Sequence, residues 1–264
     1  MQLLPIIREI RELNPRLSCR EIYFMLLPKY TGRDRFEIFC YNHGFKLEAT
    51  KNWHRTTDSL GVIRFPNLLL EKDELTGVNQ VWVSDITYYQ INKEVFYLTF
   101  ITDLFSRVIV GYCASRSLLT QETTLKALRV ALKVRDISSG SELIFHSDGG
   151  GQYYCKDFVS ITSQFGIRNS MGKNVFDNPH AERVNGTIKN DYLVPYQPKN
   201  FEELEKMLTK AVNLYNKFRP HKSLQRLAPM VFESRIKNGL LTKTWVINKK
   251  KKVVKKEKVN INII

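Results

Sequence analysis

The sequence predicts a mixed α/β fold, a sheet of several strands with helices packed around it. Three observations support this prediction. Residues 81–115 contain three successive segments rich in β-branched and aromatic residues, and helical patterns then alternate with short apolar segments. Hydrophobic residues also make up 43% of the 264-residue chain, which is enough for a packed core. The length suits one sizeable domain with smaller attachments.

The three β-rich segments are VWVSDITYYQ (81–90), VFYLTFITDLF (95–105) and RVIVGYCAS (107–115). Short polar breaks at Asn92–Lys93 and at Ser106 separate them. Breaks of this length are typical of hairpins, so we expect three consecutive antiparallel strands.

A helix–strand alternation follows these strands. Leu125, Leu128 and Leu132 recur at helical spacing and predict a helix over about 120–134. LIFHSD (143–148) is expected to be a short buried strand that runs into a glycine-rich turn. The remaining expected elements are a helix at about 155–165, a short strand near Ile167, and helices near 179–193 and 201–217. A single α/β domain can use this order.

Residues 1–45 are expected to form short helices. Ser18 followed by Glu21 is a capping-box pattern that starts one helix. Gly32 breaks the chain before a second helical stretch, which ends at Gly44, a residue suited to a left-handed cap. Two short helices around a turn are typical of a helix-turn-helix.

In a helix-turn-helix, Arg33 and Arg35 would start the second helix and contact DNA. A plain helical hairpin that only packs on the core explains the pattern equally well. Residues 46–78 are expected to be a basic linker. Its Arg55 is a candidate DNA contact, and Trp53 and His54 either stack on nucleic acid or anchor the linker.

The charge of the chain points to a polyanionic partner. Lys and Arg number 41 against 26 Asp and Glu, a formal net charge of +15. Such an excess is typical of proteins that bind nucleic acid. Residues 249–258, within a basic C-terminal tail predicted at 236–264, hold seven Lys and one Glu and contribute +6, so +9 remains elsewhere.

Cysteine usage and hydropathy exclude several classes of protein. The four cysteines are scattered without a CxxC pair, which indicates neither a disulfide framework nor a zinc site. No apolar run reaches the ~18 residues of a membrane span, and a signal-peptide pattern is absent. We therefore expect no membrane partner and a cytoplasmic, nucleoid-associated location.

Three carboxylates occupy positions that favour metal chemistry. Asp85 lies inside an apolar strand, where a carboxylate is costly unless it is paired, hydrogen-bonded or bound to metal. Asp148 ends a second apolar strand and precedes three glycines. Glu182 lies on a predicted helix, with Lys189 two turns later on the same face. Carboxylate oxygens suit Mg²⁺ or Mn²⁺, and two such ions make a phosphoryl-transfer centre.

Five sequence blocks resemble successive motifs of insertion-sequence transposases. They are WVSDITYY, TDLFSRVIVGY, HSDGGGQY, DNPHAERVNGTIKNDYL and YNKFRPHKSL. The resemblance is to the insertion sequence three family, whose catalytic domain is similar to retroviral integrase. It implies an RNase H-like integrase core, here at 79–235, with an Asp–Asp–Glu metal triad formed by Asp85, Asp148 and Glu182.

The resemblance also implies an activity and its partners. A transposase of this kind cleaves double-stranded DNA at the element ends and joins the freed 3′-hydroxyl to target DNA, with two Mg²⁺ or Mn²⁺ ions at the triad. A homo-multimer and an upstream frame product carrying a helix-turn-helix and leucine zipper are the expected protein partners. Lys189 matches a basic residue expected to contact DNA near the cut.

Three further candidate DNA contacts, Asn178, Arg219 and His221, match family blocks of less defined role. Arg219 and His221 would either bind phosphate or support the neighbouring helix, and support is the preferred interpretation. His146, two residues before Asp148, either contacts DNA or fills space. Asp103 is expected to be a hydrogen-bonded structural acid.

The sequence departs from the family pattern at two places. Asp148 and Glu182 are separated by 33 residues (149–181), two fewer than is usual, and Gly150 stands where an Arg is common. Because neither change touches an acid, activity is still expected. Two other functions stay open: a transposase-derived DNA-binding protein without catalysis, and an RNase H-like nuclease that cuts without joining.

Overall fold

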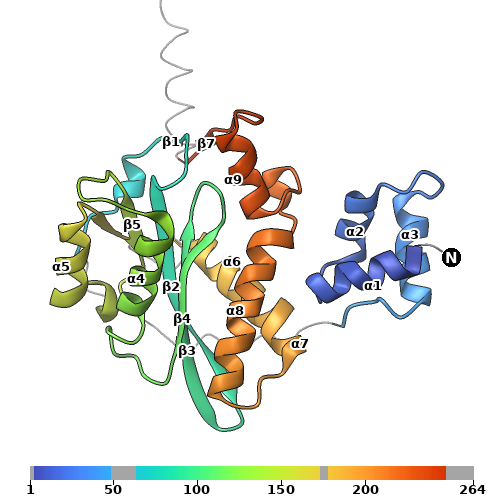
Figure 1. Cartoon of the computed structure of the whole chain (residues 1–264), viewed down its shortest axis with the longest axis horizontal. Helices are drawn as coiled ribbons and strands as arrows, with labels where there is room; N and C mark the ends of the chain where they lie inside the picture. The colour runs from blue at the N-terminus through green and yellow to red at the C-terminus, as the bar shows by residue number, and fades with distance from the viewer. Residues whose placement is uncertain (1–2, 49–63, 173–177, 248–264) are drawn as a thin grey trace, which may run out of the picture.

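The computed structural model describes residues 3–48, 64–172 and 178–247. In this part of the chain, a five-stranded sheet lies between two layers of helices, and a bundle of three helices stands at the N-terminal end (Figure 1). The predicted mixed α/β architecture with an N-terminal helical region is confirmed.

The sheet has the strand order β4–β3–β2–β5–β6. Its first three strands in the chain pair antiparallel, whereas β5 pairs parallel with β2, and β6 pairs parallel with β5. The three consecutive antiparallel strands predicted from the sequence are therefore present. The strand bounds are β2 Val81–Ile91, β3 Glu94–Asp103, β4 Ile109–Ser115, β5 Ile144–Ser147 and β6 Arg168–Met171.

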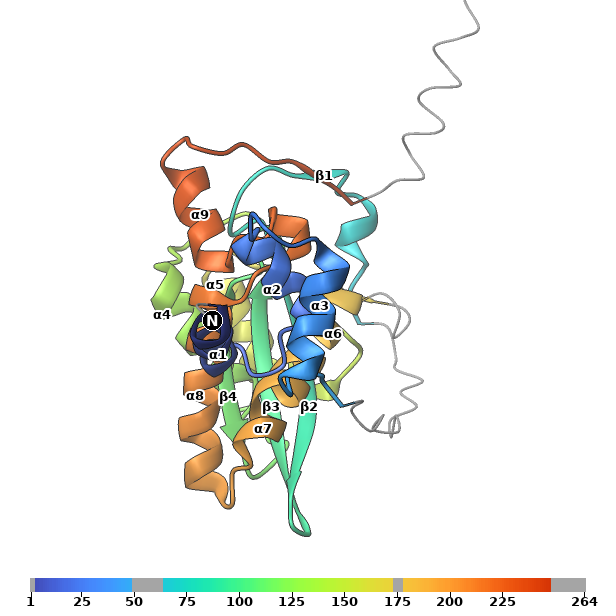
Figure 2. The ribbon, with the colours of Figure 1, turned by 90° about the vertical axis from the view of Figure 1, so that its right-hand side faces the viewer.

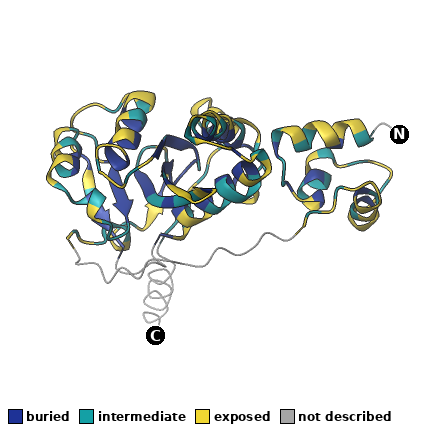
Figure 3. Cartoon of the chain, turned by 90° about the horizontal axis from the view of Figure 1, so that it is seen from below, coloured by how far each residue is buried: buried dark blue, intermediate teal, exposed yellow. Residues whose placement is uncertain are grey.

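Helices α4 (Thr124–Arg135) and α5 (Lys156–Gln164) cover one face of the sheet. Trp82 of β2 is fully buried on this face, in one cluster with Leu128 of α4 and Phe158 of α5. Figure 3 shows the strands buried between helices whose outer surfaces are exposed. Apolar burial on this scale is the main stabilising contribution to the sheet.

A second set of helices covers the other face, where Phe96 and Phe100 of β3 pack against Leu208. The first of these helices continues without a break from α6 through a π-helical segment, η4, into α7. The bounds are α6 Pro179–Thr187, η4 Ile188–Leu193, α7 Val194–Tyr196, α8 Phe201–Phe218 and α9 Pro229–Lys237. Side chains of β2 therefore alternate between the α4/α5 layer and the α6/α8 layer.

The N-terminal bundle consists of α1 (Leu3–Leu13), α2 (Cys19–Leu26) and α3 (Arg33–Asn42), which share a small buried core. The predicted helix ends are confirmed: Ser18 Oγ accepts a hydrogen bond from the Glu21 amide at 3.2 Å, and Gly44 has a φ of +81°.

The bundle lies beside α6 and α8 (Figure 2). Asn14 joins it to the core, because its Nδ2 donates to the carbonyl of Phe218 (3.4 Å) and its Oδ1 accepts from the hydroxyl of Tyr192 (2.9 Å).

The packed core extends beyond the predicted segment 79–235 at both ends. Strand β7 (Trp245–Val246) pairs antiparallel with β1 (Glu74–Leu75), and Trp245 Nε1 donates to the carbonyl of Phe105 at 3.0 Å. Apolar side chains near both strands join one buried cluster, which explains why part of the predicted linker and part of the predicted tail pack here. None of the described helices is long and apolar enough to cross a membrane.

Gly111 on β4 lies in close contact with α4. A Cβ at this position would lie 2.3 Å from the backbone oxygen of Ala127 and 2.9 Å from Cβ of Ala131. We predict that Gly111→Ala lowers the free energy of unfolding by about 1–3 kcal/mol, because α4 must move away from the strand. Urea denaturation measures this change.

Gly77→Ala is the matched control, since a Cβ at Gly77 meets no atom within 4 Å. Equal stability losses in the two variants would show that the close approach of α4 is not responsible.

Candidate active site

The pairing of β2 with β5 brings two of the predicted acids together. Val81 lies opposite Ile144, and Val83 lies opposite His146. Continued by two residues on each strand, this register places Asp85 level with Asp148, which directly follows the end of β5. Opposite residues of neighbouring parallel strands project from the same face at a strand spacing of about 4.8 Å.

The carboxylate of Asp85 is held at both oxygens. Oδ1 accepts a hydrogen bond from the amide of Ile86, and Oδ2 accepts one from Nδ2 of Asn185 on α6, each at 2.8 Å. Burial and the negative charge of Asp148 raise the pKa of Asp85 to about 7, and the charge of Glu182 acts in the same direction. These three acids therefore share one electrostatic environment.

Asp148 is stabilised by the turn that follows it. Its Oδ1 accepts a hydrogen bond from the amide of Gly150 at 3.1 Å, and burial raises the pKa of its carboxyl. A Cβ at Gly150 would lie only 3.1 Å from this same oxygen. The glycine that departs from the family pattern thus keeps the turn close to the carboxylate.

Helix α6 is docked on β2 beside Asp85. Asn178, which is buried just before the helix, donates from Nδ2 to the carbonyl of Ser84 at 2.8 Å, and Asn185 holds Asp85 one turn after Glu182. Glu182 is exposed in the first turn, between these two attachments. Asn178, predicted to contact DNA, lies against the sheet and positions the helix.

Asn185 was not among the residues predicted from the sequence. It lies three positions after Glu182 in the DNPHAERVNG block, so helical periodicity places it near the same face. This spacing was the sequence feature that could have identified Asn185 as a site residue.

Lys189 extends the same contact surface. Its Nζ donates to the hydroxyl of Thr87 (2.9 Å) and to the carbonyl of Tyr88 (3.3 Å), both on β2, and burial lowers its pKa. The lysine lies in the π-helical segment, and such segments are frequent at functional sites. Here the predicted DNA contact is bound to the sheet, two residues along β2 from Asp85.

The donor set fits a divalent cation. The three acids offer only carboxylate oxygens, the ligands that Mg²⁺ prefers, and a cation would relieve the repulsion that raises the pKa of Asp85. Within residues 3–48, 64–172 and 178–247, however, no three His, Cys, Asp or Glu side chains already form a metal cage. Asp85 and Asp148 are half-buried, whereas Glu182 is exposed and its side chain would have to turn inward to join them.

Two other polar residues have structural positions. Asp103 is fully buried, and its carboxylate accepts hydrogen bonds from the amides of Asn79, Phe105 and Ser106 at 2.6, 3.0 and 2.8 Å, so its predicted structural role is confirmed. His146 is also fully buried, with Nδ1 2.9 Å from the hydroxyl of Ser170. This position favours the space-filling interpretation of His146.

Arg219 and His221 contact neighbouring side chains of the fold. Arg219 forms an ion pair with Asp191 at 2.6 Å, and His221 packs edge-on against Tyr215 with ring centroids 5.0 Å apart. Arg33 and Arg35 are exposed at the start of α3, where Arg33 pairs with the neighbouring Asp34. Arg55, like Trp53 and His54, lies outside the described residues.

Comparison with known proteins agrees with this geometry. Two family models of the integrase core domain match residues 76–174 and 166–229. A 31 kDa protein of insertion element IS600 from Shigella sonnei is 34% identical over 208 residues, which is 77% of this chain and 75% of the relative. This chain belongs to the insertion-sequence transposases with an integrase core.

Other comparisons agree with this membership. The transposase InsF of insertion sequence IS3A from Escherichia coli K12 is 30% identical over 73% of this chain and 67% of its own length. The integrase-like fold is also found in the simian T-cell lymphotropic virus intasome, with a TM-score of 0.52 and 18% identity over 81% of this chain and 70% of that one. The predicted family and the RNase H-like fold are therefore confirmed.

The raised pKa of Asp85 predicts a pH-dependent penalty on stability in metal-free protein. Between about pH 4 and pH 7 the folded chain binds a proton at Asp85 that the unfolded chain has lost, so the free energy of unfolding falls as the pH rises through this window. Asp85→Asn removes this penalty. In EDTA, the difference in free energy of unfolding between the variant and wild type should increase, in favour of the variant, by on the order of 1–3 kcal/mol when the pH is raised from about 4 to about 8.

Urea denaturation at both pH values measures the effect. Asp157→Asn, which removes an exposed carboxylate on α5, serves as the control and should follow wild type. A difference between Asp85→Asn and wild type that does not change with pH would contradict the prediction.

Proposed function

We propose that this protein is a DNA transposase that cleaves a phosphodiester bond at each end of its element and joins the freed 3′-hydroxyl to DNA. The observation that carries the proposal is the proximity of Asp85 on β2 to Asp148, which directly follows the paired strand β5, with a helix bearing Glu182 docked beside them. Membership of the insertion-sequence transposases supports it independently.

We propose Asp85, Asp148 and Glu182 as the ligands of Mg²⁺ or Mn²⁺, with two ions in the working site. Bound there, the ions would supply Lewis-acid activation of the attacking oxygen and charge stabilisation of the leaving oxygen. The protein's own contribution is positional. Asn185 orients Asp85 and Gly150 orients Asp148 through hydrogen bonds of 2.8 and 3.1 Å, while Asn178 fixes the start of the helix that carries Glu182.

Lys189 is proposed to hold DNA close to this site. Its ammonium group already lies at β2 near Asp85, where an incoming phosphate would compete for it with Thr87 and the carbonyl of Tyr88. A phosphate accepts charge-assisted hydrogen bonds more strongly than these neutral oxygens do.

The proposed partners are double-stranded DNA at the element ends and at the target, and further copies of this chain, because two ends must be held together. The upstream frame product with a helix-turn-helix and leucine zipper is a further proposed partner. We expect the protein to act in the cytoplasm, at the nucleoid.

A strand-transfer assay on labelled element ends with Mg²⁺ tests the proposal against its two alternatives. Joined products support the transposase, hydrolysis without joining supports an RNase H-like nuclease, and DNA binding without either product supports a non-catalytic binding protein.

We predict that Asp85→Asn, Asp148→Asn and Glu182→Gln each reduce cleavage and joining more than about 100-fold, since even the loss of groups that orient a metal ligand costs 10- to 100-fold. DNA binding in EDTA should persist in all three variants. Glu142→Gln, which changes an exposed acid before β5, should retain wild-type activity. Joining at the wild-type rate by any of the three variants would remove that residue from the triad.

A further inference from the structure

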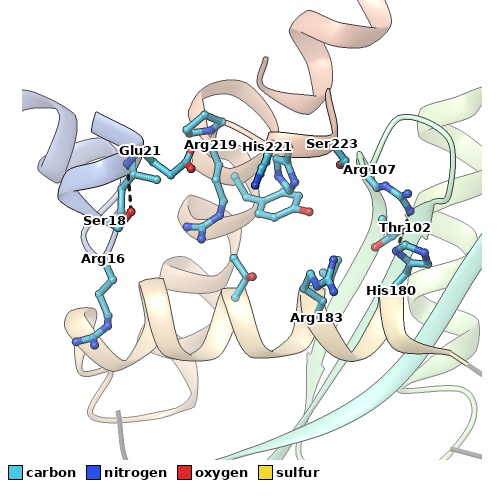
Figure 4. Close-up of a pocket in the computed structure, with 16 residues that line it drawn as sticks. Arg16, Ser18, Glu21, Thr102, Arg107, His180, Arg183, Arg219, His221 and Ser223 are labelled. Atoms are coloured by element: carbon cyan, nitrogen blue, oxygen red, sulfur yellow. Dashed lines mark hydrogen bonds between the residues drawn. The ribbon is translucent and has the colours of Figure 1, made fainter. Parts of the chain in front are cut away.

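A basic pocket lies on the side of α6 that faces the N-terminal bundle. It has a volume of about 780 Å³ and is bounded by α6, by the loop after α8 and by the start of α2. In Figure 4, His180 and Arg183 rise from α6, Arg107 lies at one end, Arg219 and His221 lie above, and Arg16 lies at the other end. Both the bundle and the core therefore contribute to this pocket.

The charges around the pocket are strongly unbalanced. Four arginines and one lysine line it, against a single carboxylate, Glu21. Glu21 already pairs with Arg226 at 3.3 Å, and the ion pair of Arg219 uses Asp191. Among the described residues, no carboxylate lies within ion-pair distance of the other four cations: Arg16, Arg107, Arg183 and Lys222.

The histidines of the pocket do not supply the missing negative charge. Nδ1 of His180 lies 3.0 Å from a guanidinium nitrogen of Arg107. Burial and the nearby charges of Arg219, Arg107 and Arg183 lower the pKa of His221 to about 3. The side chains that line the pocket therefore favour binding of an anion. The fold holds their positive charges close together even when no anion is bound.

The hollow continues along the helix. An adjoining groove of about 360 Å³ shares Arg16, Arg183 and Thr187 with the pocket and extends past Gly186 and Asn190 to Asp191, whose carboxylate pairs with Arg219. Two hollows in a row, with shared basic side chains, suit an elongated anion better than a single small one. Pocket and groove together are called the α6 groove below.

We propose that the α6 groove binds the phosphodiester backbone of a DNA strand, and that this strand bridges the N-terminal bundle to the core. Arg183 and Lys222, both exposed, make the core contacts with phosphate, and Arg16 makes the contact from the bundle. The proposal deepens the proposed function and rests on it, because it names a DNA path separate from the three acids.

The direct test is the salt dependence of DNA binding by the full chain, measured by fluorescence anisotropy with a short labelled duplex in EDTA. The double variant Arg183→Ala/Lys222→Ala should reduce the slope of log K against log salt by about 2, one for each lost phosphate contact. A fourfold rise in salt would then weaken wild type roughly tenfold more than the variant.

The matched control is Arg129→Ala/Lys133→Ala, which removes two exposed cations from α4 on the opposite face of the sheet. The control should keep the wild-type slope. An unchanged slope in the groove variant, or equal losses in the two variants, would overturn the proposal. Because both variants alter exposed side chains, their thermal unfolding should match wild type and exclude a folding defect.

Hydrogen exchange distinguishes the sources of phosphate. The duplex should protect amides 16–22 of the bundle in wild type and not in the groove variant, whereas inorganic phosphate at equal ionic strength should protect neither. Protection by inorganic phosphate alone would overturn the assignment to nucleic acid.

The salt slope and the strand-transfer assay test the groove and the transposase activity separately, since DNA binding in EDTA does not require catalysis. A reduced slope without strand transfer by wild type leaves the groove as a DNA site and removes the transposase proposal. Strand transfer with an unchanged slope removes the groove alone.

Discussion

The parallel pairing of β2 with β5 is the interaction on which the candidate site depends. It sets Asp85 level with Asp148 and leaves both carboxylates on the face that α6 covers. Two like charges in a half-buried setting are costly, and the hydrogen bonds of Ile86, Asn185 and Gly150 offset only part of this cost. The raised pKa of Asp85 reflects the part of this cost that is not offset, and a bound cation would reduce it.

Helix α6 connects this acidic site to the basic groove. One side of the helix carries Asn185 toward β2, and the other carries Arg183 and Thr187 toward the N-terminal bundle. In the proposed complex, this separation of opposite charges by the width of one helix would let DNA approach the acids while its backbone contacts the basic side. The docking of α6 through Asn178 thus fixes the acidic and basic surfaces relative to each other.

Local sequence patterns predicted the elements whose formation depends on neighbours along the chain. The β-rich segments, the Ser18 cap and the hydrogen-bonded Asp103 follow from residue type, spacing and turn chemistry, and they are present. The pairing of Trp245 with Leu75 could not be predicted in this way, because it joins residues far apart in the sequence. The α6 groove was missed for the same reason: Arg16, Arg107 and Arg183 come together only in the folded chain.

The different settings of the three acids indicate how such a site is assembled. Asp85 lies on β2 and Asp148 directly follows the adjacent strand β5, and backbone amides donate hydrogen bonds that fix both carboxylates. Glu182 is exposed on a helix that is itself anchored on both sides of it, by Asn178 and Asn185, so only its side chain has to move. Three fixed carboxylates without a cation would destabilise the fold more than two, since each added charge repels both others. An adjustable third acid on a fixed helix limits that repulsion, and in the proposed metal site Glu182 would join the other two acids only when the cation binds.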